Sequence, residues 1–158
     1  ITALDHDLTT MDEDALARFR RDHMGVVFQS FHLIPTMTAL ENVATPLELA
    51  GTKDAFDRAA AELETVGLAS RANHYPAQMS GGEQQRVAVA RSLINDPKII
   101  FADEPSGNLD SESAETLHNL FFKLRDEFGQ TFVIVTHNEE LANLADRKLT
   151  MVDGKIVG

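Results

Sequence analysis

The stretch at residues 79–110 constrains the fold and the chemistry of this chain more than any other part of it. It contains a helical pattern opened by two glycines, a stop at Pro97, and then a short apolar strand at 99–102. Two carboxylates, Asp103 and Glu104, follow the strand at once, and a Gly-Asn-Leu-Asp turn leads into a second helical pattern. Each piece suits phosphate chemistry, and their combination is far more specific than any one of them alone.

The start of this helix carries a capping signal. Ser80 can accept a hydrogen bond from a free N–H of the first turn, and Glu83 completes a Ser-x-x-Glu capping box. An ordinary capped helix explains both residues. The same geometry also suits phosphate, because Gly81 and Gly82 have no side chain to block its approach and the helix dipole attracts it. Both interpretations stay open from this segment alone.

The two carboxylates at the strand end are costly if they are buried without partners. Because side chains alternate along a strand, Asp103 and Glu104 can do different work. One carboxylate can hold Mg²⁺ through its water shell, and the other can polarise an attacking water. The competing interpretation is a solvated loop after a strand, which a lone Asp-Glu pair fits equally well.

In their order and spacing, four segments resemble those of the ATP-binding subunits of ABC transporters, over nearly the whole chain. SGGEQ at 80–84 is similar to the family signature, FADE at 101–104 to the Walker B strand, and SGNLD at 106–110 to the D-loop. VIVTH ends at His137, which matches the switch histidine. Among subfamilies, residues 25–51 together with SGNLD look most like the group that serves lipoprotein release and macrolide export (MacB-type).

The resemblance implies the α/β fold of a P-loop NTPase (RecA-like) core, present in part, with an α-helical subdomain that carries the signature. Residues 1–29 and 95–158 would form the partial core, and residues 30–94 the helical subdomain. It also implies a homodimer of ATP-binding subunits that closes head to tail around ATP. The implied partner is a transmembrane permease subunit at the cytoplasmic face of the inner membrane, and the implied function is ATP hydrolysis that powers export or lipoprotein or lipid extraction.

The resemblance also assigns roles to residues at the strand ends. Asp103 would hold Mg²⁺, and Glu104 would act as the general base toward water. Gln29 follows an apolar strand at 25–28 and would contact Mg²⁺ or the attacking water, since an amide offers both a donor and an acceptor. His137 would orient the γ-phosphate and the water. An ordinary loop glutamine and a structural histidine are the competing interpretations of Gln29 and His137.

The remaining implied contacts reach across the dimer. The signature would clasp the γ-phosphate of the ATP bound by the other subunit; its residues here are Ser80, Gly81, Gly82 and Glu83. Asp110 would tie the two ATP sites together. Glu83 stands where the family commonly has Gln, and this change removes neither Ser80 nor the glycines. We therefore expect little functional damage from it.

One motif that the family needs is not found in this sequence. A Walker A loop has the pattern G-x-x-x-x-G-K-[ST], whereas the only Gly-Lys step here, Gly154-Lys155, lies in a hairpin signal without the required upstream glycine. We therefore expect a piece of a longer ATPase, which alone binds ATP weakly and hydrolyses it negligibly. The alternative is a catalytically inactive fragment that serves as a docking module for a membrane subunit or a second ATPase.

Composition disfavours several other classes of protein. The formal net charge of −11 argues against nucleic acid as a partner, because nucleic-acid binding favours a basic patch. The chain has no cysteine for a disulfide or a thiolate metal site, and no apolar run of about 20 residues that could span a bilayer. An ABC ATPase of DNA repair or chromosome organisation is disfavoured too, since those proteins carry a long coiled coil between the Q-loop and the signature, whereas only about 50 residues separate Gln29 from Ser80 here.

The other segments give a simple pattern of helices and strands. We expect helices at 9–22, capped by Thr10, and at 38–50, bent or divided by Pro46. An amphipathic helix at 52–66 is expected to bury one apolar stripe, which comprises Ala55, Phe56, Ala59, Ala60, Leu63 and Val66.

The last third of the chain holds one more long helix, a strand and a hairpin. The helix is expected at 111–128, and TFVIVT at 131–136 is typical of a strand buried on both faces of a parallel sheet. Asp153-Gly154 is a strong hairpin turn signal. Apolar residues also follow Gln29, and they either pack inside the domain or, as the resemblance implies, line a groove for a coupling helix of the transmembrane subunit; they are Phe31, Leu33, Ile34 and Met37.

Overall fold

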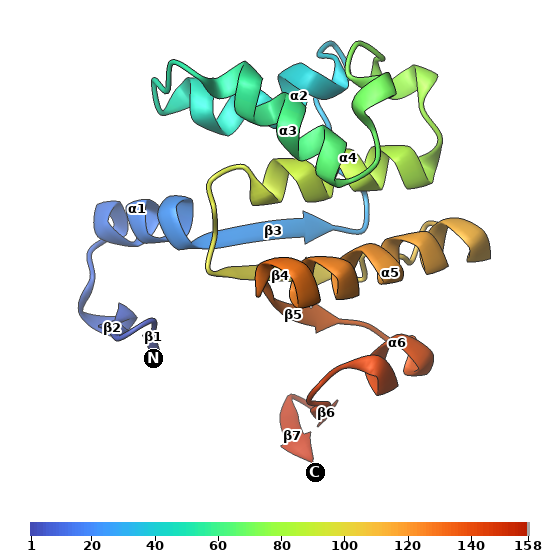
Figure 1. Ribbon diagram of the computed structural model, residues 1–158. Helices are drawn as coiled ribbons and strands as arrows, with labels where there is room; N and C mark the ends of the chain where they lie inside the picture. The colour runs from blue at the N-terminus through green and yellow to red at the C-terminus, as the bar shows by residue number, and fades with distance from the viewer. Residues whose placement is uncertain (158) are drawn as a thin grey trace.

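A parallel sheet of three strands lies at the centre of the structure, a computed structural model that describes residues 1–157 (Figure 1). The strands are β3 (Met24–Phe28), β4 (Ile99–Asp103) and β5 (Thr131–Val135), and β4 lies between the other two. Because both pairs are parallel, the carboxyl ends of the strands meet at one edge of the sheet. Helices connect the strands, so the predicted α/β class is confirmed.

The two faces of this sheet differ in their cover. One row of register partners lies on the face that packs against helices; it comprises Val27, Ala102 and Ile134. The adjacent row, on the opposite face, is 37% to 44% exposed; it comprises Val26, Phe101 and Val133. The prediction that β5 is buried on both faces is therefore wrong, because residues 1–157 leave this second face largely open to solvent.

Helix α4 (Gly81–Leu93) lies on the covered face and packs against β3 (Figure 1). The approach is closest at Gly25, where an added Cβ would lie 2.6 Å from the carbonyl oxygen of Ser92. Only glycine leaves room for such a backbone contact. Helices α2 (Ala39–Leu49) and α3 (Ala55–Thr65) pack against α4 and form the upper layer in Figure 1.

The predicted division into a core (residues 1–29 and 95–158) and a helical part (residues 30–94) stays a prediction. Helix α4 falls in the helical part of that division, yet it packs against β3 as well as against α2 and α3. The buried residues of the sheet and of the helices accordingly form one continuous apolar cluster. The core of the described chain is therefore shared between the two predicted parts.

A local capping signal determines where α2 begins. Thr38 and Glu41 form a capping box, since the Thr38 hydroxyl accepts a hydrogen bond from the Glu41 N–H (3.3 Å) and the Glu41 carboxylate accepts one from the Thr38 N–H (2.7 Å). Pro46 lies inside α2 without dividing it. The buried side chain of Asn42 binds the preceding loop, because its Oδ1 accepts from the Ile34 N–H at 2.7 Å.

The buried stripe of α3 is narrower than predicted. Its buried residues recur every three or four positions and comprise Ala55, Ala59, Leu63 and Val66. Phe56 and Ala60 are exposed, and their assignment to the stripe is wrong, because each lies one residue, about 100° around the helix, beyond a buried one. The helix begins at Ala55 rather than at residue 52. Gly67, with a φ of +74°, follows its end in the left-handed conformation.

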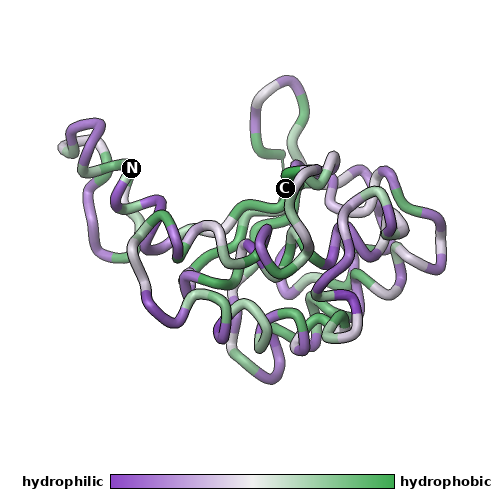
Figure 2. Tube along the Cα trace, turned by 90° about the horizontal axis from the view of Figure 1, so that it is seen from above, coloured by the Kyte–Doolittle hydropathy of each residue, from purple (hydrophilic) through white to green (hydrophobic). Residues whose placement is uncertain are grey.

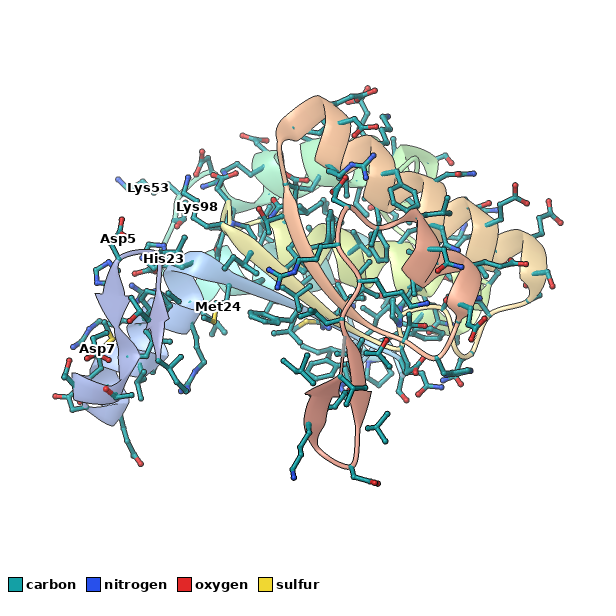
Figure 3. The ribbon with its side chains drawn as sticks, turned by 90° about the horizontal axis from the view of Figure 1, so that it is seen from below. Asp5, Asp7, His23, Met24, Lys53 and Lys98 are labelled. Carbon is teal, nitrogen blue, oxygen red and sulfur yellow. The ribbon has the colours of Figure 1, made fainter. Side chains whose placement is uncertain are left out.

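The amino-terminal segment extends from the body of the molecule (Figure 3). It comprises β1 (Thr2–Ala3), β2 (His6–Asp7), the 3-10 helix η1 (Leu8–Thr10) and α1 (Glu13–His23). The predicted cap at Thr10 is wrong, because the Asp12 carboxylate accepts the capping hydrogen bond, from the Ala15 N–H at 2.7 Å. At the other end of α1, the His23 carbonyl accepts a hydrogen bond from the Lys98 N–H at 2.9 Å, which joins α1 to the start of β4 (Figure 3).

The carboxyl-terminal third follows the predicted order. Its elements are α5 (Ser111–Phe128), α6 (Glu139–Leu144), β6 (Thr150–Val152) and β7 (Lys155–Val157); two 3-10 helices, η2 (Ala69–Arg71) and η3 (Pro76–Gln78), lie earlier, before α4. Asp153 and Gly154 both have a positive φ in the turn between β6 and β7, as the hairpin signal predicts.

Seen from above, apolar segments gather in the middle of the molecule, whereas the amino-terminal segment is mainly hydrophilic (Figure 2). No helix within residues 1–157 has the length and apolar character that a membrane crossing requires.

Candidate functional site

The candidate site lies at the edge where the three strands end. Phe28, Asp103 and Val135 are register partners there. Because parallel strands end in the same direction, the next residues of each chain segment emerge side by side; these include Gln29, Glu104 and His137. The structure thus brings together the predicted residues at the strand ends, which come from segments far apart in the sequence.

Glu104 is held by the loop that follows β5. Its Oε1 accepts hydrogen bonds from the His137 backbone N–H at 2.9 Å and from His137 Nδ1 at 2.8 Å. Its Oε2 accepts one from Thr136 Oγ1 at 3.3 Å, and its own N–H donates to the Val135 carbonyl at 2.8 Å. Glu104 also has a φ of +44°, a conformation that costs a non-glycine residue about 1–3 kcal/mol. The carboxylate is therefore fixed in one orientation at the expense of backbone strain.

The contact with Glu104 also determines the proton position on His137. An ionised carboxylate only accepts hydrogen bonds, so Nδ1 of His137 carries the hydrogen. In the neutral ring, Nε2 is then an acceptor, and it becomes a donor only when the ring is protonated. The side chain is 83% exposed, so Nε2 is accessible to a ligand at this edge.

Gln29 is paired with a residue that the sequence did not single out. Its Nε2 donates to Asn108 Oδ1 at 3.1 Å, and Asn108 Nδ2 donates back to the Gln29 carbonyl oxygen at 3.2 Å. A Cβ added at Gly107 would lie 2.6 Å from Gln29 Nε2, so the glycine permits this close approach. Asn108 stands in the Gly-Asn-Leu-Asp turn, and a polar residue in that turn was the only available signal for its role.

Two residues of α4 hold the backbone on either side of Gln29. Gln85 is fully buried, and its Nε2 donates to the Phe28 carbonyl at 3.0 Å and also to the Pro105 carbonyl. Arg91 donates to the carbonyls of Phe31 and His32 at 3.0 and 2.8 Å, and both of these residues have a positive φ. The sequence signal for Gln85 was a polar residue on the apolar side of a helix, where it needs partners.

The predicted capping box at the start of α4 is confirmed. Ser80 Oγ accepts a hydrogen bond from the Glu83 N–H at 3.2 Å, and Glu83 Oε2 accepts one from the Ser80 N–H at 2.9 Å. Glu83 Oε1 also accepts from Arg71 Nε at 2.9 Å. The Ser80 N–H lowers the pKa of Glu83, and Arg71 adds to this effect while partial burial opposes it.

The two signature glycines have different surroundings. A Cβ added at Gly81 would find only ordinary contacts, with Leu109 at 3.6 Å and Phe31 at 3.7 Å. At Gly82 it would lie 2.8 Å from the Cβ and Oγ of Ser113, the residue that approaches from α5. Gly82 is thus required for the packing of α4 on α5, a reason that the sequence interpretation did not include.

Asp110 caps helix α5 rather than standing free in its loop. Its Oδ1 accepts from the Ser113 N–H and its Oδ2 from Ser113 Oγ, both at 2.9 Å, and these hydrogen bonds lower the pKa of Asp110. Further along α5, His118 Nε2 lies 2.9 Å from Ser106 Oγ, and burial lowers the pKa of His118. The loop between β4 and α5 is therefore attached to α5 at two points. Ser106, near its start, pairs with His118, and Asp110, at its end, pairs with Ser113.

The strand ends offer oxygen atoms that fit Mg²⁺. Asp103 is exposed, and among residues 1–157 no protein group makes an ion pair or a hydrogen bond with its carboxylate. Gln29 Oε1 is likewise unpaired within the described chain, because the contact with Asn108 uses Nε2. Mg²⁺ in phosphate-transfer sites binds one or two protein oxygens and takes its other ligands from water and phosphate. These two oxygens suit such a site, although no group of three His, Cys, Asp or Glu side chains in residues 1–157 is arranged to hold a metal.

Comparison with known proteins gives consistent relatives. Residues 1–107 match the family model described as ABC transporter. The chain is 56% identical over 155 residues to the lipoprotein-releasing system ATP-binding protein LolD of Cytophaga hutchinsonii, covering 97% of this chain and 71% of that protein. It is 48% identical over 158 residues to the ABC transporter ATP-binding protein YbbA of Escherichia coli, covering 99% and 69% of the two chains.

A solved structure shows the same fold. It is the dimeric, post-hydrolysis state of the ATP-binding cassette MJ0796 bound to ADP and Pi, with a TM-score of 0.84 and 42% identity over 98% of this chain and 69% of that one. The predicted P-loop NTPase fold is confirmed by this likeness. The predicted resemblance to the lipoprotein-release group is confirmed by the LolD relatives. The chain therefore belongs to the ABC transporter family, as an ATP-binding subunit.

Proposed function

We propose that this chain hydrolyses ATP, as part of an ABC transporter that extracts lipoprotein or lipid from a membrane or exports it. The observation that carries the hydrolytic part is the Glu104 carboxylate, which His137 fixes in a strained loop at the strand edge where Asp103 and Gln29 also lie. The cargo class is supported by the likeness to the LolD proteins, which are named for lipoprotein release.

In the proposed reaction, Glu104 takes a proton from the water that attacks the γ-phosphorus of ATP. The new bond joins the water oxygen to phosphorus, and the bond from phosphorus to the β–γ bridging oxygen breaks, so ADP carries away that oxygen and phosphate is released. His137 and Thr136 keep Glu104 aimed at the water. Mg²⁺, when bound by Asp103 and Gln29, supplies charge neutralisation on the phosphates.

The start of α4 is the proposed contact with a second copy of the chain. Ser80 and Gly81 lie at the amino-terminal, positive end of a helix, which favours a phosphate group. The γ-phosphate there would belong to ATP held mainly by the other subunit, with Glu83 fixing the loop and Asp110 linking the two sites. The dimeric form of the MJ0796 cassette supports this arrangement. Gly82 serves it indirectly, through its contact with Ser113.

A transmembrane permease subunit is the proposed membrane partner, reached from the cytoplasmic face. The segment after Gln29 is the proposed contact. Leu33 packs partly into the core, which supports the packing interpretation for this side chain. Phe31, Ile34 and Met37 are only half-buried, so they remain candidates for contact with a coupling helix.

ATP turnover by the natural full-length protein, in complex with its membrane partner, tests the proposal. Glu104→Gln keeps the size and the hydrogen-bond acceptor but removes the base, so kcat should fall by about 10²–10⁴ while ATP binding is retained. Glu115→Gln, an exposed glutamate of α5, is the matched control and should keep wild-type turnover. Equal turnover in the Glu104 variant and wild type would refute the role of Glu104.

The docking-module alternative makes a different prediction in the same experiment. A protein that binds its membrane partner but shows no turnover even with Glu104 intact would be a docking subunit. The chain of 158 residues by itself is expected to bind ATP weakly and to hydrolyse it negligibly. Turnover by this chain alone that is lost in Glu104→Gln would overturn that expectation.

A further inference from the structure

We propose that Asn108 is a positioning residue that turns the Gln29 carboxamide so that its oxygen, and not its nitrogen, is free at the strand-end site. The inference rests on the proposed function, since it concerns how Gln29 reaches Mg²⁺ or the attacking water. It starts from the reciprocal pair of hydrogen bonds between the two residues, at 3.1 and 3.2 Å. These residues are 79 positions apart in the sequence.

The orientation of both amides follows from one atom that cannot change its role. The Gln29 backbone carbonyl only accepts hydrogen bonds, so the Asn108 atom that faces it must be the nitrogen, Nδ2. The Asn108 oxygen, Oδ1, then faces the Gln29 side chain. An oxygen acceptor requires a donor, so the Gln29 side chain presents Nε2 to Asn108 and leaves Oε1 free. A flip of either amide would place two donors or two acceptors against each other.

The free atom is the one that the proposed chemistry needs. A carboxamide oxygen is a ligand for Mg²⁺ and accepts a hydrogen bond from water, whereas an NH₂ group can do neither. Without Asn108, the Gln29 amide would rotate between its two nearly isosteric orientations. No protein hydrogen bond would then distinguish the two orientations, and a fixed orientation would be lost.

Two hydrogen bonds and one glycine keep the two loops at the distance that this pair requires. Gln85 binds both backbones at once, through the Phe28 carbonyl just before Gln29 and the Pro105 carbonyl just after Glu104. Gly107 has no Cβ, and an added one would come within 2.6 Å of Gln29 Nε2. The hydrogen bonds between Gln29 and Asn108 are thus supported by the way the two loops are joined, and they do not depend on the two side chains alone.

The first test is a double-mutant cycle on ATP turnover by the natural full-length protein with its membrane partner. Asn108→Ala should lower kcat about tenfold in the wild-type background, because a misdirected ligand atom is a positional error next to the reaction. In the Gln29→Ala background the same change should have no further effect, since no amide is left to orient. Asn143→Ala, an exposed asparagine of α6, is the matched control and should leave turnover unchanged.

The second test needs no nucleotide. In ¹⁵N NMR spectra of the same full-length protein, the side-chain NH₂ of Gln29 gives two proton signals, and the one from the hydrogen bound to Asn108 Oδ1 should lie downfield of its position in a free amide. Asn108→Ala should move this signal back to the position of a free amide, Asn143→Ala should leave it unchanged, and a signal that does not move in Asn108→Ala would overturn the orienting role.

The outcomes separate this inference from the proposed function. If turnover depends on Glu104 but Asn108→Ala is silent, or costs the same in both backgrounds, the orienting role is wrong and the hydrolytic function stands. If turnover does not depend on Glu104, the proposed function fails, and the NMR signals of Gln29 still decide whether Asn108 orients its amide.

Discussion

The Glu104 carboxylate receives two hydrogen bonds from His137, one from the backbone N–H at 2.9 Å and one from Nδ1 at 2.8 Å. We expect His137→Ala to keep the first bond and lose the second, so that only the backbone N–H and the longer contact from Thr136 Oγ1 still hold the carboxylate. In the full-length protein kcat should fall about 10–100-fold, less than for loss of the base itself. Steady-state kinetics measure this, with His6→Ala in the amino-terminal hairpin as a control that keeps normal turnover. Unchanged kcat in His137→Ala would show that the backbone contact alone positions Glu104.

Gly82 and Gly81 should respond differently to alanine. Gly82→Ala places a methyl group 2.8 Å from Ser113, so we expect a loss of about 1–3 kcal/mol in unfolding free energy. Ser113→Gly should recover part of this loss in the double variant. Gly81→Ala meets only ordinary contacts and should leave stability nearly unchanged, so any loss of turnover there reports on the ligand. Urea denaturation of each variant gives the comparison, and a destabilised Gly81→Ala protein would contradict it.

Glu83 is expected to matter as an acceptor more than as a charge. Glu83→Gln keeps an oxygen for the Ser80 N–H and should change the unfolding free energy little, although it loses the ion pair with Arg71. Glu83→Ala removes the acceptor and should cost about 1 kcal/mol. Because the pKa of Glu83 is lowered in the fold, the smaller contribution of its charge is present above the pKa of the unfolded chain and is lost as pH falls through the lower, folded value. Thermal unfolding at neutral and acidic pH measures both effects, and equal losses in the two variants would contradict them.

Glu62 predicts the opposite pH dependence. Burial, together with the charge of Asp96, raises its pKa, with Arg58 opposing the shift. The folded chain therefore binds this proton more tightly than the unfolded chain, and stability is lost as pH rises from the unfolded pKa through the folded one. Glu62→Gln should raise Tm by about 1–2 °C at neutral pH and give no gain below pH 4. The exposed neighbour Glu64→Gln is the control, and a gain that persists in acid would rule out this cause.

Those parts of the fold that depend on neighbouring residues were predictable from the sequence. Helix α5 begins and ends at the predicted residues, because Asp110 caps it and Gly129, with a φ of +65°, closes it. The carboxylates at the end of β4 were found in the same way, since an apolar strand positions whatever follows it. The capping of α1 was not predicted correctly, because TTMDED offers several good caps and only the Asp12 side chain reaches the helix.

The features that depend on distant residues could not be predicted. TFVIVT reads the same whether one or both faces of its strand are covered, so the exposure of Val133 needed the structure. No local pattern connects Gln29 with Asn108, or Gln85 with two backbone carbonyls in different loops. A buried polar side chain indicates that partners exist, but their identity is a property of the assembled fold.

Helix α4 has a mechanical consequence that follows from its attachments. Ser80 is the N-cap of this helix, and two side chains of the same helix, Gln85 and Arg91, bind main-chain carbonyls before and after Gln29. A displacement of the amino-terminal end of α4 must therefore move the loop around Gln29 as well, or break those hydrogen bonds. At Gly25 the backbones of α4 and β3 approach closely, so no flexible layer of side chains can absorb the displacement there. Engagement of a second subunit at Ser80 and repositioning of Gln29 would then be one concerted event with a single rate, rather than two successive steps.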